Sequence, residues 1–169
     1  MKRYLLILAM LAMIVAISGC TSENNSNKTY SANGVTFTYP GNATELNSSV
    51  IQAQVGSTGQ LLGVVGDNSS FLFGVAKVNL NSDQRLATLS EWAASYNKTI
   101  ATTNETYISE KNITIDGVSG IMIASNDSSF FYREAFFAKN GTGYLAILLT
   151  KTDDEALFNQ IVNTLKITG

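Results

Sequence analysis

The residue with the most distinctive chemistry is Cys20, the only cysteine in the chain. It directly follows Ile17, Ser18 and Gly19, so an apolar run ends in two small residues before a thiol. Small residues let a peptide lie extended in a peptidase, and a thiolate is a nucleophile that can accept a lipid. We therefore expect cleavage before Cys20 and attachment of a lipid to its sulfur. A single cysteine also excludes an internal disulfide and a cysteine-based metal cage.

The segment before Cys20 has the features of a signal peptide over residues 1–19. It opens with two basic residues and continues with an uncharged run from Tyr4 to Ile17. As a helix, this run would extend about 21 Å, which is short of the ~30 Å hydrocarbon core of a bilayer. Together with Cys20, the segment resembles the lipobox of prokaryotic lipoproteins. The alternative is an ordinary signal peptide with a chance cysteine, or an uncleaved anchor.

Lipidation would decide where the protein resides. Each buried methylene contributes about 0.8 kcal/mol, so one acyl chain binds a membrane reversibly and two or more anchor a protein stably. A lipobox cysteine normally carries a lipid with several chains. We therefore predict that Cys20 holds the protein on the outer face of the cytoplasmic membrane.

Asparagine is unusually frequent. Sixteen are present and ten begin an Asn-X-Ser/Thr triplet, where chance predicts about three. On an exported protein each triplet is a candidate N-glycan acceptor, and an archaeal surface is the setting that combines a lipobox with such glycans. A polar surface rich in turn residues explains the excess without glycans. The candidates are Asn24, Asn27, Asn42, Asn47, Asn68, Asn97, Asn104, Asn112, Asn126 and Asn140.

The chain contains no histidine. Ser-His-Asp and Cys-His catalysis are therefore excluded, together with the usual zinc hydrolase sites. The acidic residues are scattered, and no pair stands out as general acid and general base. The sequence therefore predicts no catalytic residue, no cofactor and no metal ligand.

Two charged groups could carry chemistry but have simpler explanations. Asp153, Asp154 and Glu155 could bind calcium, although acids in the first turn of a helix suffice to explain them. Arg133 and Glu134 are neighbours on a predicted strand and point to opposite faces, so they cannot act as one pair. A cross-strand ion pair is expected for each of them.

Two further groups are also explained by structure. Trp92 and Tyr96 lie four residues apart and could form an aromatic platform for a ligand, but packing of a helix against the core is the favoured explanation. Gly63, Gly66 and Gly74 do not precede a predicted helix, so they do not support a phosphate-binding loop.

The charge balance argues against nucleic-acid binding. Two of the eleven basic residues lie in the leader, which leaves nine basic and thirteen acidic residues, a net charge of about −4. There is no basic stripe. The mature length of about 150 residues fits one domain with a sizeable core.

Residues 20–29 are rich in Ser and Asn and lack an apolar period, which predicts a flexible tether. A single domain is expected over residues 30–169. Within it, apolar patterning predicts antiparallel strands, with a two-residue hairpin turn at Asp116-Gly117. The predicted strands cover residues 34–40, 50–55, 60–65, 71–80, 107–115, 118–124, 129–139 and 144–150.

Two segments have the apolar period of a helix. The first extends from about Leu89 to Ile100. The second covers residues 153–165 behind a capping box at Thr152, and residues 166–167 are expected to return to a sheet edge.

Two of the predicted strands carry apolar residues on both faces, which is typical of a sheet covered on both sides. The pattern extends from Phe130 to Phe137 and from Tyr144 to Leu149. We therefore expect an α+β fold, with an antiparallel β-sheet of about six strands flanked by helices on both faces.

Several segments occur in a characteristic order. They are Gly34-Val-Thr-Phe-Thr-Tyr-Pro40, Ile115-Asp-Gly-Val-Ser-Gly120, Phe131-Tyr-Arg-Glu-Ala-Phe-Phe-Ala-Lys-Asn-Gly141, Tyr144-Leu-Ala-Ile147 and a closing Phe158, Ile161 and Leu165. This order resembles the PsbP-like domain family, most closely the PsbP-related lipoproteins of methanogenic archaea. One departure is that the tryptophan usual after the strand ending at Pro40 is missing.

The resemblance implies an α/β/α sandwich. Photosynthetic members are extrinsic proteins that help retain ions at a membrane complex, and some members bind metals through histidines, which this chain lacks. For the archaeal lipoproteins, the resemblance implies a surface domain of unassigned function.

These observations favour a lipid-anchored cell-surface accessory or binding domain without catalytic activity. Its partners would be the membrane, through the lipid, and a protein or envelope component, with no nucleic acid. Two alternatives stay open. One is an envelope-acting hydrolase or transferase that uses two carboxylates in one cleft, and the other is a structural glycosylated surface protein.

Overall fold

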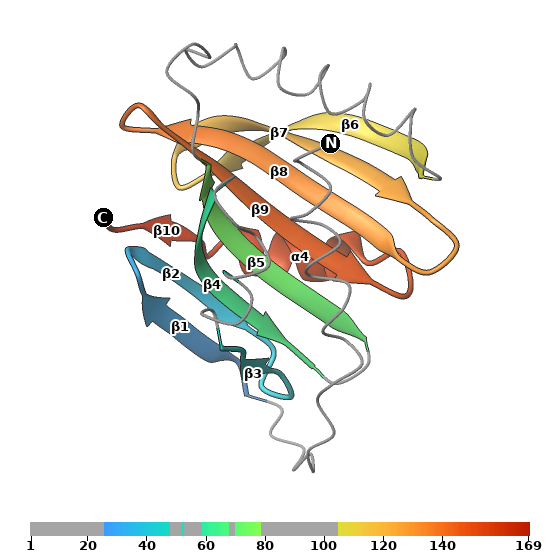
Figure 1. The fold of residues 1–169 in the computed structure, drawn as a ribbon, viewed down its shortest axis with the longest axis horizontal. Coiled ribbons are helices and arrows are strands. Elements are labelled where there is room, and N and C mark those ends of the chain that lie inside the picture. Colours follow the sequence, from blue (N-terminus) through green and yellow to red (C-terminus); the bar gives the residue numbers. More distant parts are fainter. Residues whose placement is uncertain (1–25, 48–51, 53–58, 68–69, 79–104) are drawn as a thin grey trace.

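The computed structural model describes residues 26–47, 52, 59–67, 70–78 and 105–169. These residues form two antiparallel sheets and one helix (Figure 1). The larger sheet has seven strands in the order β3-β4-β5-β9-β8-β7-β6, and the smaller has three in the order β1-β2-β10. The elements are β1 (Lys28–Ala32), β2 (Val35–Tyr39), β3 (Thr44–Glu45), β4 (Gly59–Gly66), β5 (Phe71–Val78), β6 (Thr106–Ile115), β7 (Val118–Asn126), β8 (Phe131–Lys139), β9 (Thr142–Thr150), α4 (Glu155–Val162) and β10 (Lys166–Ile167).

Three hairpins close through two-residue turns in which both residues have positive φ. The turns are Asn33-Gly34 (51° and 78°), Asp116-Gly117 (51° and 78°) and Asn140-Gly141 (52° and 75°). Asn, Asp and Gly tolerate this region, and such turns match the twist of the flanking strands. The predicted turn at Asp116-Gly117 is confirmed. The turn at Asn33-Gly34, and with it β1, was not predicted from the sequence.

The four-strand meander predicted from residue 107 onward is confirmed. β6, β7, β8 and β9 pair in succession, each antiparallel to the next. β9 also pairs with β5, so the earlier β4–β5 hairpin extends the same sheet. Thr150 of β9 lies opposite both Phe71 and Phe131, which aligns the ends of three strands at one end of the domain.

The prediction of about six strands flanked by helices on both faces is wrong. In the described residues, one face of the seven-stranded sheet packs against the small sheet and against the helix α4. The predicted helix from Leu89 to Ile100 lies outside the described residues. The apolar face of a strand must pack against another apolar element. The pattern of apolar residues along the strand does not show whether that element is a helix or a second sheet.

Aromatic side chains form the contact between the two sheets. The ring centroid of Phe37 in β2 lies 4.9 Å from that of Tyr30 and 5.1 Å from that of Phe73 in β5. The Tyr30 hydroxyl donates a hydrogen bond to the carbonyl of Leu62 at 2.7 Å. A Cβ atom at Gly63 would lie 2.6 Å from Cε1 of Tyr30, so this approach requires glycine. The small sheet is therefore seated directly on β4 and β5.

The opposite face of the larger sheet carries a second apolar cluster. Its buried members come from β4, β5, β8 and β9, and they are Leu61, Val64, Leu72, Ala76, Tyr132, Ile147 and Leu149. Because successive strand residues point to opposite faces, these side chains lie on the far side from the inter-sheet core. The prediction that the central strands are buried on both faces is confirmed.

The helix α4 is shorter than predicted and begins at a different cap. Oδ1 of Asp154 accepts a hydrogen bond from the backbone N–H of Leu157 at 2.8 Å, so Asp154 is the N-cap in place of Thr152. The buried residues of the helix are Phe158, Ile161 and Val162. The chain then enters β10, which pairs with β2, so the predicted return of residues 166–167 to a sheet edge is confirmed.

Asp116 ties β10 to the hairpin between β6 and β7. Its Oδ2 accepts a hydrogen bond from the backbone N–H of Ile167 at 2.9 Å and pairs with Lys139, while its Oδ1 lies 3.3 Å from Nζ of Lys166. Burial acts to raise the pKa of Asp116, but the hydrogen bonds from these groups, the one from Lys139 first, together outweigh it. The pKa of Asp116 is therefore lowered.

Replacing Asp116 by asparagine is expected to lower the free energy of unfolding by about 1–2 kcal/mol at neutral pH. Asn-Gly suits the same turn, so the change removes the charge and keeps the backbone. Because the folded-state pKa lies below the unfolded value of ~3.9, the contribution is fully present above that value and is lost as the pH falls through the folded-state pKa. Urea unfolding of both proteins between pH 7 and pH 2 measures it. A difference that does not shrink in acid would contradict the ionic role.

Candidate functional site

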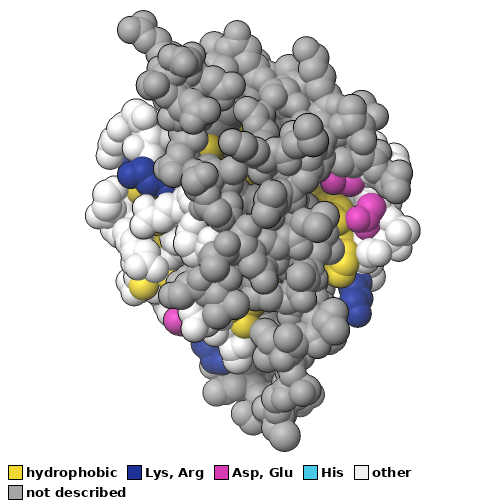
Figure 2. Space-filling view, viewed as in Figure 1, with side chains coloured by type: hydrophobic (Ala, Val, Ile, Leu, Met, Phe, Trp, Pro, Cys, Tyr) yellow, Lys and Arg dark blue, Asp and Glu magenta, His cyan; other side chains and the backbone are white. Residues whose placement is uncertain are grey.

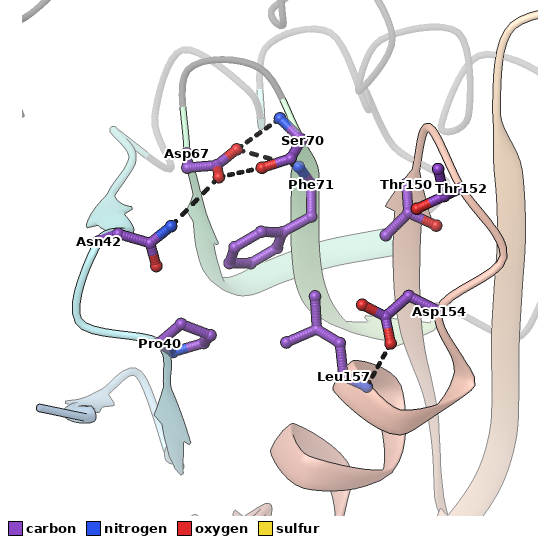
Figure 3. Close-up of a pocket in the computed structure, with 9 residues that line it drawn as sticks. All are labelled: Pro40, Asn42, Asp67, Ser70, Phe71, Thr150, Thr152, Asp154 and Leu157. Carbon is purple, nitrogen blue, oxygen red and sulfur yellow. Dashed lines mark hydrogen bonds between the residues drawn. The ribbon is translucent and has the colours of Figure 1, made fainter. Parts of the chain in front are cut away.

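A pocket of about 210 Å³ lies at the end of the domain where β2 ends and β5 begins (Figure 3). Three segments far apart in the sequence form it: the β2–β3 turn, the β4–β5 turn and the loop from β9 into α4. Its lining residues are Pro40, Asn42, Asp67, Ser70, Phe71, Thr150, Thr152, Asp154 and Leu157. The pocket therefore exists only because strand pairing aligns these ends.

Asp67 organises one wall of the pocket. Its Oδ1 accepts hydrogen bonds from the backbone N–H groups of Ser70 at 2.6 Å and Phe71 at 3.0 Å. Its Oδ2 contacts the Ser70 hydroxyl and accepts a hydrogen bond from the side-chain amide of Asn42 at 3.4 Å. Both carboxylate oxygens thus hold the β4–β5 turn and join it to the β2–β3 turn.

The opposite wall presents further oxygen atoms. Asp154 caps α4, Thr150 is buried at the end of β9, and Thr152 is exposed in the loop between them. Figure 3 shows the side chains of Phe71 and Leu157 between these two walls. Hydroxyl, amide and carboxylate groups around a small apolar surface suit a compact ligand with several hydrogen-bond donors.

Neither acid in the pocket has the surroundings of a general acid or base. Asp67 accepts hydrogen bonds on both oxygens, and Asp154 is committed to the helix cap. Glycoside hydrolysis needs two carboxyl groups that are free to act on one substrate. The pocket therefore does not favour the hydrolase alternative.

A buried arginine fastens the loop that leads from β9 into α4. Arg133 of β8 is 5% exposed, and its guanidinium pairs with Asp153 and, at 3.8 Å, with Glu155. Lys111 of β6 also pairs with Glu155, and its hydrogen bond is the main cause of the lowered pKa of Glu155. The acids that could have been read as a calcium site thus have structural partners.

Arg133 and Glu134 point to opposite faces, as predicted. The partners of Arg133 come from the loop and the helix, so the expected cross-strand ion pair is wrong for Arg133. Glu134 is 1% exposed on the other face, with Ile123 and Ile147 as its neighbours in the strand register.

Replacing Asp153 and Glu155 together by asparagine and glutamine is expected to destabilise the protein more than replacing Arg133 by methionine. The first change leaves a buried guanidinium without a counter-charge and should cost about 3 kcal/mol, whereas the second leaves two carboxylates that water can solvate and should cost about 1–2 kcal/mol. Chemical denaturation of the three proteins compares them. The reverse order would show that Arg133 acts through packing of its stem and not through charge.

Several predicted site residues lie outside the described residues. They are Cys20, Asn24, Asn68, Trp92, Tyr96, Asn97 and Asn104. Gly63 and Gly66 lie in β4 and Gly74 in β5, so all three are strand residues.

Six of the candidate glycosylation sites fall in the described residues. Asn126 is half-buried, and the exposed ones are Asn27, Asn42, Asn47, Asn112 and Asn140. They are spread over turns, element ends and one strand, so the fold does not gather them into one site.

The described residues show neither a metal-binding cluster nor a membrane-spanning helix. This part of the chain holds no group of three or more metal-ligating side chains placed to bind an ion, and its helix is not of a length and hydropathy that could cross a membrane. Charges of both signs are scattered over the described surface in the view of Figure 2, without a continuous basic stripe in that part of it.

The pocket was not predicted because its residues meet only through strand register. The hydrogen bonds of Asp67 to Ser70 and Phe71 are local, but nothing in the neighbouring sequence places these residues beside Asn42 or Asp154. The Asn33-Gly34 dipeptide could have indicated a hairpin turn at this position. This turn reveals β1 and therefore the second sheet, whose β2 ends at the pocket.

No family model matches the chain, and no curated protein matches its sequence. Among solved structures, the fold is similar to the solution structure of cyanobacterial PsbP (CyanoP) from Synechocystis sp. PCC 6803. The TM-score is 0.60 at 16% sequence identity, and the match covers 89% of this chain and 98% of that chain. The chain therefore has a PsbP-like fold.

Two further structures match more loosely. One is a protein of unknown function from Pseudomonas aeruginosa, described as a putative regulator, with a TM-score of 0.43, 11% identity and coverage of 79% of this chain and 88% of that chain. The other is from Bacteroides thetaiotaomicron, with a TM-score of 0.44, 7% identity and coverage of 80% and 46%.

Proposed function

We propose that the protein is a lipid-anchored accessory or binding domain on the outer face of the cytoplasmic membrane, without catalytic activity. The observation that carries the proposal is the position of Cys20. It ends a signal-like segment and lies only eight residues before the first strand of the domain. The lipobox and the excess of Asn-X-Ser/Thr triplets together support an archaeal lipoprotein.

The short connection would keep the domain near the bilayer. Asn27 accepts a hydrogen bond from the side chain of Gln160 in α4 at 3.3 Å, so the chain is already tied to the domain at this residue. Seven residues beyond Cys20 span at most ~25 Å when extended. A lipid on Cys20 would therefore hold the domain within about that distance of the membrane surface.

The same end of the domain carries the pocket. Lys28, at the start of β1, donates a hydrogen bond from Nζ to the carbonyl of Ala43 at 3.0 Å. Ala43 belongs to the β2–β3 turn, which also contributes Pro40 and Asn42 to the pocket. The pocket thus lies close to the start of β1, which suits a partner or ligand that is itself at the membrane.

A non-catalytic role is supported by chemistry and by fold. The chain has no histidine, and the acids of the pocket are engaged in a turn and a helix cap. The PsbP-like fold also belongs to a family with extrinsic accessory members, although fold by itself does not assign function. The binding role rests on the anchor and the pocket together.

Site-specific photocrosslinking in intact membranes tests the proposal. A photoreactive residue is placed at Asn42, beside the pocket, and as a matched control at Asn140, an exposed position in the hairpin at the other end of β9. We expect a reproducible adduct from position 42 that is absent from position 140. If position 42 yields no adduct and native mass spectrometry finds no co-purifying small molecule, the binding role is wrong.

A further inference from the structure

β6 forms an edge of the seven-stranded sheet, and among the described strands it pairs only with β7. An open edge is a template for pairing with another chain, and natural proteins protect such edges. β6 is ten residues long and largely exposed. It carries Tyr107 and Ile108, at 46% and 41% exposure the large hydrophobic residues most open to solvent in the described part of the chain. This edge is therefore prone to self-association.

Only one half of the edge is disrupted. A bulge breaks the register between Tyr107 and Ser109, which twists that part of the strand away from regular pairing. From Ser109 to Ile115 the register with β7 is regular, so this stretch presents an even row of backbone groups. The bulge does not protect the stretch from Ser109 to Ile115 against pairing with another chain, so another feature must do so.

Asn112 lies at the centre of this regular half and begins the triplet Asn112-Ile113-Thr114. Ile113 and Ile115 contact the main core, so Asn112 and Thr114 point to the other face, and both are exposed. In the described structure, the Asn112 side-chain amide makes no hydrogen bond. It is therefore free for modification.

The other exposed triplet asparagines differ from Asn112 in position or in contacts. Asn42 donates to Asp67, and Asn27 accepts from Gln160. Asn140 lies in a hairpin turn, away from any strand edge, and Asn47 follows the end of β3. Among these sites, Asn112 is the one within an edge strand.

We propose that Asn112 is an N-glycosylation site whose glycan prevents β6 from pairing with β6 of a second copy. In a symmetric antiparallel pairing of the two regular stretches, the two Asn112 side chains lie on the same face near the twofold axis. Two bare amides fit there, whereas two glycans collide. The proposal rests on export to the cell surface, as proposed above, but not on any binding partner.

The modification is a glycosyl transfer from a lipid-linked oligosaccharide phosphate or diphosphate. The amide nitrogen of Asn112 forms a bond to C1 of the first sugar while the bond from C1 to the phosphate oxygen breaks. The phosphate leaves with the electron pair, and the amide loses one proton. Thr114 supplies the hydroxyl residue that the triplet requires.

Two matched valine substitutions distinguish the effect of a glycan at the β6 edge from the effect of losing a glycan elsewhere. Thr114→Val removes the triplet at Asn112 and keeps a β-branched residue in the strand. Thr142→Val makes the same change in the triplet of Asn140 at the hairpin. Thr114→Ser keeps the triplet. Each full-length protein is purified in detergent from membranes of a host that carries out N-glycosylation, then examined by glycopeptide mass spectrometry and sedimentation velocity.

We expect a glycan on Asn112 and a monomer for the unchanged protein and for T114S. T114V should lose this glycan and form dimers or larger species at least tenfold more readily, while T142V stays monomeric. A bare Asn112 alongside glycans at other sites overturns this inference alone, whereas a chain that is bare at every site also counts against export. A monomeric T114V, or equal self-association of T114V and T142V, overturns edge protection.

Discussion

Replacing Phe37 by alanine is expected to lower the free energy of unfolding by about 3–5 kcal/mol, the range for a fully buried phenylalanine. Phe37 has no exposed surface, and its ring contacts Tyr30, Tyr39 and Phe73 with centroid distances of 4.9, 6.3 and 5.1 Å. The loss therefore opens a cavity between the two sheets. Since a domain of this size is stable by only about 5–15 kcal/mol, the variant should be close to the limit of folding.

Phe131→Ala is the control for this experiment. Phe131 is half-buried at the start of β8 and belongs to neither of the two apolar clusters. The same chemical change there should cost about 1–2 kcal/mol. Urea unfolding followed by circular dichroism measures both. If Phe37→Ala were no worse than Phe131→Ala, the small sheet would not be packed on the large one as described.

The sheet itself could be predicted from local patterns. Alternating apolar residues defined β2 and the meander from β6 to β9, and Asp116-Gly117 placed a turn because few residues other than Asp, Asn and Gly accept positive φ at both positions. Residues 166–167 were expected at a sheet edge and form β10 there. The strands and hairpin turns depend on residues that are close in sequence, whereas the partner of β10 is β2, from a distant part of the chain.

What covers the sheet could not be predicted in the same way. Apolar residues on both faces of β8 and β9 show that both faces are buried, but helices and strands bury such a face equally well. One of these faces is covered by a three-stranded sheet in which residues 166–167 pair with β2, with Lys166 opposite Thr36. No local pattern records a pairing between segments so far apart. The resemblance to PsbP-like domains was correct for the fold, whereas the helices on both faces, expected from the strand pattern and implied by the resemblance, were wrong.

The pocket also depends on contacts between residues that are far apart in the sequence. Asp67 and Asp154 each make local contacts that a sequence can suggest, an Asp-Asn-Ser-Ser turn and a helix cap. Their meeting around Phe71 depends on Thr150 pairing with Phe71 across β5 and β9. The helix was predicted, but with Thr152 and not Asp154 as its cap, and the site that these residues build was not predicted.

Removing Cys20 together with the native leader is expected to abolish membrane attachment completely. A chain that begins at Thr21 behind an ordinary cleavable signal peptide should be exported, folded and recovered in the soluble fraction, because nothing then replaces the ~0.8 kcal/mol per methylene of the acyl chains. Cys20→Ser in the native leader should remain an unlipidated precursor that is heavier by the retained leader. Detergent phase partitioning and immunoblotting of both variants beside the unchanged protein measure these outcomes.

The matched control keeps Cys20 and lengthens the tether by ten Gly/Ser residues before Asn27. This variant should stay in the membrane fraction while crosslinking from position 42 declines, because the pocket is no longer confined near the bilayer. Equal crosslinking with both tether lengths would contradict the role assigned to the short connection.

The most direct test of the lipid anchor is the mass of the N-terminal peptide of the protein purified from membranes. We expect a peptide that begins at Cys20 and carries a thioether-linked lipid of two or more chains. A mature peptide that begins at any other residue, or one that begins at Cys20 with a free thiol, would contradict it.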